Sequence, residues 1–274
     1  MSDMDILQKA LAEVEAGSRI PYLGAGVSAL SQGGAPASPE ALDKIIEGEV
    51  RVPKRAQGNL WSAAQYVESR KFRATLVDIV NRAFEPDEGG NPVHDWLARV
   101  RPPMVVDTWY DDGLIKAYEG ASWGWVQGWS RNGEWIEIWN KAFAPDGTEL
   151  EAPNPDWASL IYKPHGIARK GSSFLLSDSD YVEVLTEIDI QTPIPEEVRH
   201  RRTNRSFLFL GCRFDDQMLR IFARQIVKRS GGNHVAVIEG EVSRMEQKFL
   251  DEMGIVRVNL PVSAVVEALA SEPA

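Results

Sequence analysis

The amino-acid sequence predicts an α/β fold, in which helices cover a doubly wound, mostly parallel β-sheet. Short, continuous apolar runs that end at turn residues are typical of parallel strands buried on both faces, and the chain has several of them. Helical patterns with an apolar face alternate with these runs. With 274 residues, of which 43% are hydrophobic, the chain is long enough for one large α/β domain with a real core.

The expected elements follow in order along the chain. An amphipathic helix opens the sequence at residues 1–17, and further helices are expected over 59–84, 215–229 and 241–253. Apolar strands are expected at 20–23, 103–106, 207–210, 235–238 and 256–260. Ligands of an open parallel sheet bind at the carboxyl ends of its strands, so this Rossmann-like arrangement predicts a nucleotide site at that edge.

Residues 121–160 differ in composition from the rest of the chain. Residues 121–150 alone hold five of the nine tryptophans, and Asn132-Gly133 and Asp146-Gly147 are turn pairs that favour hairpins. We expect a small tryptophan-rich β insert, folded as a meander within a single domain that spans 1–274. Most of its tryptophans would form a small aromatic core, because so short a meander has no other.

Charge and cysteine content exclude several classes of protein. The 40 acidic residues outnumber the 30 basic ones, so no overall field draws the chain to nucleic acid or an anionic membrane, and neither is an expected partner. No apolar run approaches the roughly 20 residues of a bilayer span. The single cysteine, Cys212, allows neither an internal disulfide nor a cysteine-ligated zinc, which fits a bacterial-type protein of the reducing cytoplasm. The four histidines lack metal-ligand spacing, and no metal site is expected.

The strand expected at 20–23 breaks into Gly24-Ala25-Gly26. Glycines after a strand let the chain turn with positive φ and let main-chain N–H groups approach a ligand, and a following helix N-terminus attracts phosphate. A nucleotide is therefore the candidate ligand. The alternative is that glycine serves only the geometry of the turn, as it does in many strand-to-helix connections.

Four segments carry motifs whose order is informative. They are GAGVS at 24–28 with GGAP at 33–36, HDWLARVRPPMVVDTWYDD at 94–112, YKPHGI at 162–167 with FLLSDSDYVEVL at 174–185, and FLFLGCRFDDQML at 207–219. In this order they resemble the sirtuin-like (silent-information-regulator-like) family of NAD-binding proteins, closest to the bacterial branch found in antiphage defence. The resemblance covers the chain from about residue 20 to about residue 260 and implies an NAD site at the carboxyl ends of the strands.

The resemblance also implies roles for individual residues. The cofactor-binding residues would be Gly24, Ala25, Gly26, Val27, Ser28, Thr108, Trp109, Gly211 and Asp216. The glycine turn would present N–H groups to the pyrophosphate, and Gly211 would let the adenosine ribose lie close. His165 would be the general base that accepts a proton from a ribose hydroxyl when the nicotinamide–ribose bond breaks, since imidazole titrates near neutral pH.

One position departs from the family pattern. In Asp107-Thr108-Trp109-Tyr110-Asp111, Trp109 stands where the family has an asparagine that positions water or the ribose, and indole has one donor and no acceptor. Three interpretations stay open. In the first, Asp107 or Asp111 takes over the orienting role, and these carboxylates are the catalytic candidates beside His165. In the second, the chain binds a nucleotide without cleaving it. In the third, Trp109 joins the tryptophan-rich insert and shapes a pocket for another ligand.

The sequence thus predicts a sirtuin-like NAD-binding protein with NAD hydrolase activity of the glycohydrolase type. The alternative is a catalytically inactive nucleotide-binding sensor or assembly protein. A sirtuin deacylase is not expected, because its zinc module needs four cysteines and the chain has one. An adenine dinucleotide is the expected ligand, and regulation would come from a homo-oligomer or a separate regulatory protein.

Overall fold

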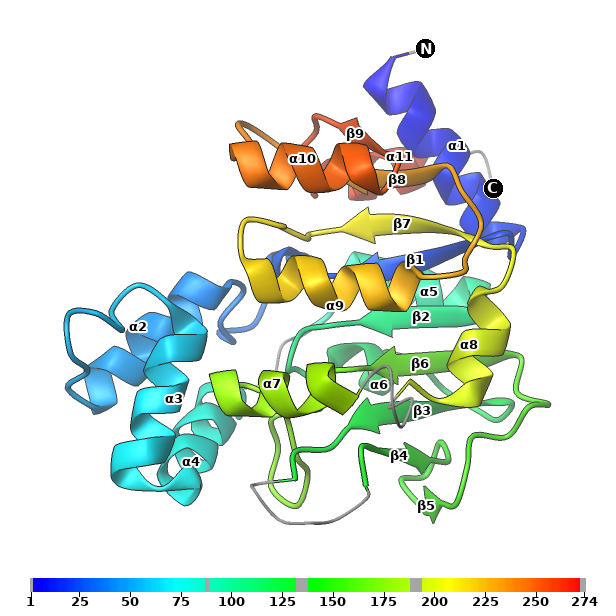
Figure 1. The fold of residues 1–274 in the computed structure, drawn as a ribbon. Helices are drawn as coiled ribbons and strands as arrows, with labels where there is room; N and C mark the ends of the chain where they lie inside the picture. Colours follow the sequence, from blue (N-terminus) through cyan, green and yellow to red (C-terminus); the bar gives the residue numbers. More distant parts are fainter. Residues whose placement is uncertain (1, 87–88, 132–137, 188–193, 272–274) are drawn as a thin grey trace.

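The computed structural model describes residues 2–86, 89–131, 138–187 and 194–271, and a single large sheet organises them (Figure 1). Its nine strands are β1 (Arg19–Leu23), β2 (Met104–Asp107), β3 (Trp123–Gly128), β4 (Asn140–Phe143), β5 (Glu149–Leu150), β6 (Ser159–Lys163), β7 (Ser206–Leu210), β8 (His234–Val237) and β9 (Ile255–Val258). They lie in the order β5-β4-β3-β6-β2-β1-β7-β8-β9. All pairs from β3 to β9 in this order are parallel, and β4 and β5 extend one edge in antiparallel fashion. The predicted Rossmann-like α/β fold is confirmed.

Helices cover both faces of the sheet, because successive side chains of each buried strand point to opposite sides. On β1, Ile20 and Tyr22 join one apolar cluster and Leu23 joins the other. The first cluster includes side chains of α2 (Pro39–Glu49), α3 (Leu60–Lys71), α4 (Arg73–Ala83), α7 (Asp178–Glu187), α8 (Glu196–Arg202), α9 (Gln217–Val227) and α10 (Arg244–Glu252). The second includes side chains of α1 (Asp3–Glu15), α5 (Pro92–Val100), α6 (Gly113–Ala117) and α11 (Ala264–Ser271). Within the described ranges, no helix is long and apolar enough to cross a bilayer.

The helix expected over 59–84 is two helices in the structure. α3 ends at Lys71 and α4 begins at Arg73. The helix breaks between them because the backbone of Phe72 has a φ of 72°, a value that residues other than glycine rarely adopt. Apolar residues on both sides of the break pack into the same cluster, including Val67 and Leu76. The apolar period therefore continues across the break and could not reveal it.

The helices α2, α3 and α4 lie beyond the carboxyl ends of the central strands (Figure 1). They pack on one another and form a helical layer. Asn59 caps α3 by accepting a hydrogen bond from the backbone N–H of Ser62, and Ser38 caps α2 in the same way through the N–H of Ala41. These caps fix where the layer begins, next to the edge at which the sequence predicts a ligand site.

The tryptophan-rich region joins the main sheet. β3 pairs with β6 in parallel, from Trp123 opposite Ser159 to Gln127 opposite Lys163. β3, β4 and β5 follow one another in antiparallel pairs, as the expected meander requires, and the structure adds that β3 also belongs to the main sheet as an inner strand. The hairpin expected at Asn132-Gly133 lies outside the described residues.

Candidate functional site

A pocket of about 160 Å³ lies where the turns after β1, β2, β6 and β7 meet the helical layer. The strand-end turns contribute Gly24, Ala25, Gly26, Thr108, Trp109, Tyr110, His165, Gly211, Cys212, Arg213, Phe214 and Asp215. The helices and their leading segments contribute Ala37, Ser38, Pro39, Glu40, Leu60, Trp61, Tyr181 and Leu219, and Tyr22 lies at the base. The pocket thus occupies the edge of the sheet at which open α/β folds bind their ligands.

The structure brings most of the predicted site residues together in this lining. Val27, Ser28, Asp107, Asp111 and Asp216 are the predicted residues that lie outside it. Asp216 caps α9 by accepting the backbone N–H of Met218 at 2.6 Å. No group of three His, Cys, Asp or Glu side chains in the described part of the chain could hold a metal ion.

The glycine turn packs tightly against the turn after β7. A Cβ on Gly24 would lie 2.5 Å from the carbonyl oxygen of Gly211, and one on Gly26 would lie 2.9 Å from its Cα. The N–H of Gly24 donates to the carbonyl of Leu210, and that of Gly26 donates to Gly211, both at 2.9 Å. These two amides hold the turns together, whereas the amide of Ala25 makes no hydrogen bond to another described residue. Close packing is therefore the first reason for glycine here, and Ala25 is the amide of the turn that a phosphate could reach.

His165 follows β6 and is almost completely buried. Its Nδ1 lies 3.0 Å from the carbonyl oxygen of Thr108, and because a carbonyl only accepts, Nδ1 carries the proton and donates. Nε2 is then the bare nitrogen, and it is buried without a hydrogen-bond partner among the described residues. The rings of Tyr181 and Phe222 pack against the imidazole at centroid distances of 5.4 and 4.8 Å. His165 therefore brings a nitrogen without a hydrogen-bond partner to the residues that line the pocket.

Burial lowers the pKa of His165 to about 4, and the nearby Lys163 ammonium adds to this effect while the bond to Thr108 opposes it. Burial removes the water that would solvate a charged imidazolium, so the charged form is disfavoured. The side chain is therefore neutral at pH 7, which is the form that can accept a proton.

Trp109 lines the pocket but its polar group is already engaged. The indole Nε1 donates to the carbonyl oxygen of Pro36 at 2.6 Å. Its ring packs against Tyr110 and Phe84 at centroid distances of 5.1 and 5.9 Å. Since indole has no acceptor and its one donor is used, Trp109 cannot orient a water as an asparagine amide would.

A buried set of polar side chains supports the lining from behind, and we call it the strand-end network. It consists of Ser28, His94, Asp107, Asp111 and Lys163. The Lys163 Nζ donates to Asp107 Oδ2 at 2.6 Å, and Ser28 Oγ donates to Asp111 Oδ2 at 2.8 Å. Asp107 Oδ1 also accepts the backbone N–H of Trp109 at 3.1 Å. The two carboxylates predicted to be catalytic are thus engaged inside the protein.

The charges of the strand-end network shift one another's pKa values. Burial raises the pKa of Asp107 to about 6, and Lys163 opposes this shift, so the ion pair is kept at neutral pH. Burial also raises the pKa of Asp111, but Lys163, His94 and the Ser28 hydrogen bond outweigh it and lower the pKa below its usual value. Burial lowers the pKa of His94 to about 4. The network therefore holds one lysine and two carboxylates as charges away from water.

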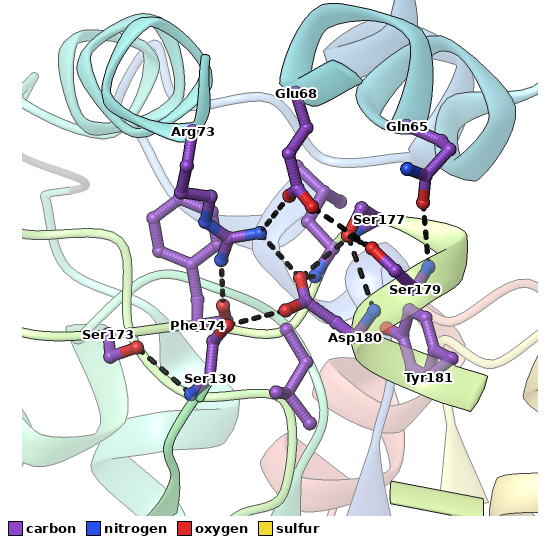
Figure 2. A network of polar contacts seen from close by, with 12 residues as sticks. Gln65, Glu68, Arg73, Ser130, Ser173, Phe174, Ser177, Ser179, Asp180 and Tyr181 are labelled. Carbon is purple, nitrogen blue, oxygen red and sulfur yellow. Dashed lines mark hydrogen bonds and ion pairs between the residues drawn. The ribbon is translucent and has the colours of Figure 1, made fainter. Parts of the chain in front are cut away.

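Figure 2 shows a second polar network, which joins α3 and α4 to the beginning of α7. This helix network consists of Glu68, Arg73, Ser130, Ser179 and Asp180. Arg73 Nη1 donates to Asp180 Oδ2 at 2.6 Å and to Glu68 Oε2 at 2.7 Å. Asp180 Oδ2 also accepts the backbone N–H groups of Leu176 and Ser177, which fixes the start of α7. The residue after Asp180 is Tyr181, whose ring packs against His165 in the pocket.

Sequence reasoning missed three of the side chains that shape the site. Lys163 stands in the segment that contains His165, and a lysine within an apolar strand signals a buried ion pair. Tyr181 lies in the quoted segment 174–185, but nothing local shows that its hydroxyl lies 3.2 Å from that of Tyr110. Arg213 follows Gly211 closely, and its place in the pocket depends on contacts with α10.

Comparisons with known proteins agree with this arrangement. The family model of the SIR2-like domain matches residues 103–257, more than half of the chain. NAD(+) hydrolase ThsA from Enterococcus faecium is 24% identical over 255 residues, which are 91% of this chain and 48% of that protein. Defense-associated sirtuin 2 from Bacillus subtilis is 27% identical over 175 residues, which are 61% of this chain and 15% of that protein. The chain therefore spans less than half the length of each of these two relatives.

Proposed function

The chain belongs to the family of SIR2-like domains, and we propose that it binds NAD in the pocket at the strand ends and cleaves the nicotinamide–ribose bond. The observation that carries the proposal is the bare, buried Nε2 of His165 in that pocket. The name of the first relative, an NAD(+) hydrolase, supports the choice of substrate and reaction. The name of the second supports a role in defence.

The reaction follows from the tautomer of His165. When the bond between C1′ of the ribose and nicotinamide breaks, its electron pair leaves with nicotinamide and the ribose becomes oxocarbenium-like. A ribose hydroxyl gives its proton to His165 Nε2, water adds to C1′, and the proton of that water restores the ribose hydroxyl. The Thr108 carbonyl accepts from Nδ1 and stabilises the imidazolium that forms. The imidazolium then returns the proton to solvent.

Replacing His165 tests this role directly. We expect His165→Gln to reduce nicotinamide release about 100-fold or more, because amide side chains are not bases at neutral pH. Affinity for NAD, measured by calorimetry, should change little. His200→Gln is the matched control, since His200 is exposed on α8 and does not line the pocket. Equal release by the wild type and His165→Gln would show that another group is the base.

A second candidate function is NAD binding without cleavage. It is favoured by Trp109, because the indole N–H already donates to the carbonyl of Pro36. Under this function the wild type binds NAD and releases no nicotinamide. Trp109→Asn places an amide where the family resemblance expects one and is then predicted to gain cleavage, measured by chromatography. Release by the wild type itself would reject this candidate. If both the wild type and Trp109→Asn bind NAD without releasing nicotinamide, the site lacks a further group that cleavage needs, in addition to the amide.

A further inference from the structure

The proposed ligand carries two phosphates, and the pocket offers them few donors. Two of the three amides of the glycine turn are used within the protein. The carboxylates of Glu40 and Asp215 line the same pocket, and the chain has a net charge of −10. Both facts oppose the binding of an anion unless a cationic side chain lies nearby.

Arg213 is such a side chain. Of the described residues in the lining, His165 and Arg213 are the basic ones, and His165 is neutral at pH 7. The Arg213 side chain is 47% exposed, so a ligand in the pocket can reach it. It follows Gly211, whose backbone packs against the glycine turn that contains Ala25. The guanidinium and the open amide of Ala25 therefore come from two turns in direct contact.

The guanidinium is held in one orientation from the far side. Arg213 Nε and Nη2 donate to the two carboxylate oxygens of Glu246 at 3.1 and 2.9 Å, and Nη2 also donates to the carbonyl of Glu241. Glu246 lies on α10, is fully buried, and also accepts the backbone N–H of Phe214 at 2.8 Å. Nη1 makes no hydrogen bond to another described residue. A bidentate pair of this kind fixes the plane of the guanidinium and leaves one edge for a ligand.

We propose that Arg213 binds a phosphate group of the dinucleotide, with its free Nη1 donating to a phosphate oxygen and Glu246 fixing the guanidinium from behind. This inference rests on the proposed function, because it takes the ligand of the pocket to be NAD. It assigns phosphate recognition chiefly to an arginine of the β7 turn, with the Ala25 amide as a second donor. The pyrophosphate is present in NAD and ADP-ribose, and a 2′-phosphate is present in NADP alone.

Calorimetric titration of the full chain with ADP-ribose tests the inference. We expect Arg213→Gln to weaken ADP-ribose binding about tenfold or more, because a charged hydrogen bond is lost. Arg213→Lys keeps the charge without the fork and should retain part of the affinity. Arg224→Gln is the matched control: Arg224 lies on α9, pairs with Glu252 at the surface and does not line the pocket, so affinity should stay within about twofold.

Several outcomes would overturn or redirect the inference. Equal affinity of the wild type and Arg213→Gln for ADP-ribose, NAD and NADP would overturn it. A loss confined to NADP would keep the phosphate contact and assign it to the 2′-phosphate. An equal loss with adenosine, which has no phosphate, would overturn it, since the variant would then have disturbed the pocket. Failure of the wild type to bind any of the nucleotides would overturn the proposed function and this inference with it, which separates the two cases.

Discussion

The two polar networks around the pocket differ in how much water reaches them. In the strand-end network, the side chains of Lys163 and Asp107 are 0% and 4% exposed. In the helix network, those of Arg73 and Glu68 are 15% and 22% exposed, and among its charged side chains only that of Asp180, at 5%, is about as buried as the strand-end pair. Water can take the place of a lost partner at Arg73 or Glu68, whereas a lost partner at the strand ends leaves a charge in apolar surroundings. Burial, more than the number of bonds, therefore decides which network is indispensable.

The same difference separates the tasks of the two networks. The strand-end network holds the backbone of the pocket lining, because Asp107 binds the N–H of Trp109 and Ser28 joins η1 (Ala25–Leu30) to Asp111. The helix network holds parts that come from different layers, namely α4, α7 and the segment at Ser130. The strand-end network thus holds the turns that follow β1 and β2, and the helix network attaches α4 to α7.

The largest effect is expected from Lys163→Met. It removes one partner of a buried ion pair and leaves Asp107 uncompensated, which costs about 3–5 kcal/mol of unfolding free energy. Urea unfolding followed by circular dichroism measures the loss. The double variant Lys163→Met, Asp107→Asn should recover a good part of it, because no bare charge remains. A loss below about 1 kcal/mol for Lys163→Met would contradict the claim that the strand-end network contributes more to stability than the helix network.

Acid should weaken the strand-end network, together with the nearby His165, more than the helix network. The pKa of His94 and His165 is about 4 in the folded protein and about 6.5 when unfolded, so the unfolded chain takes up protons first as pH falls. The stability that these neutral histidines contribute is present above pH 6.5 and is lost between pH 6.5 and 4. Asp107, with a pKa of about 6, opposes part of this loss because it takes up its proton in the folded state first.

His94→Gln isolates this contribution. The loss of unfolding free energy between pH 7 and pH 5 should be about 2 kcal/mol smaller than in the wild type, as measured by urea unfolding at the two pH values. Arg73→Gln should leave that pH-dependent loss unchanged, since no histidine takes part in the helix network. Equal pH dependence in the wild type and His94→Gln would mean that the pKa of His94 does not differ between the folded and unfolded states.

The smallest of the three effects is expected in the helix network itself. Arg73→Gln removes charged hydrogen bonds that water can partly replace, so we expect a loss of about 1–2 kcal/mol in urea unfolding. Arg82→Gln, which removes an exposed arginine of the same helix, should change stability by less than about 0.5 kcal/mol. If Arg73→Gln cost as much as Lys163→Met, partial exposure would not be what distinguishes the networks.

The sequence predicts the fold well because buried parallel strands leave a local trace. The apolar runs before Gly24 and Gly211 are strands in the structure, and the family match confirms the sirtuin-like resemblance. The break at Phe72 leaves no such trace, since it depends on one backbone angle and not on the apolar period. The pairing of β3 with β6 leaves no local trace either, because it is a tertiary property.

The site is predicted less completely, because its chemistry depends on pairs distant in sequence. His165 was placed by its motif and lies in the pocket. One of the three interpretations gives Asp107 or Asp111 an orienting role, but the sequence does not show that Lys163 and Ser28 bind these carboxylates. The glycine turn was expected to bind phosphate, but its packing on Gly211 could not be read from local sequence.

The most direct test of the central claim is a calorimetric titration of the wild-type protein with NAD, followed by chromatography of the same mixture for free nicotinamide. We predict saturable binding and nicotinamide release, with His165→Gln keeping the binding and losing the release. No binding of NAD by the wild type, or undiminished release by His165→Gln, would contradict the assignment of an NAD-cleaving site at the strand ends.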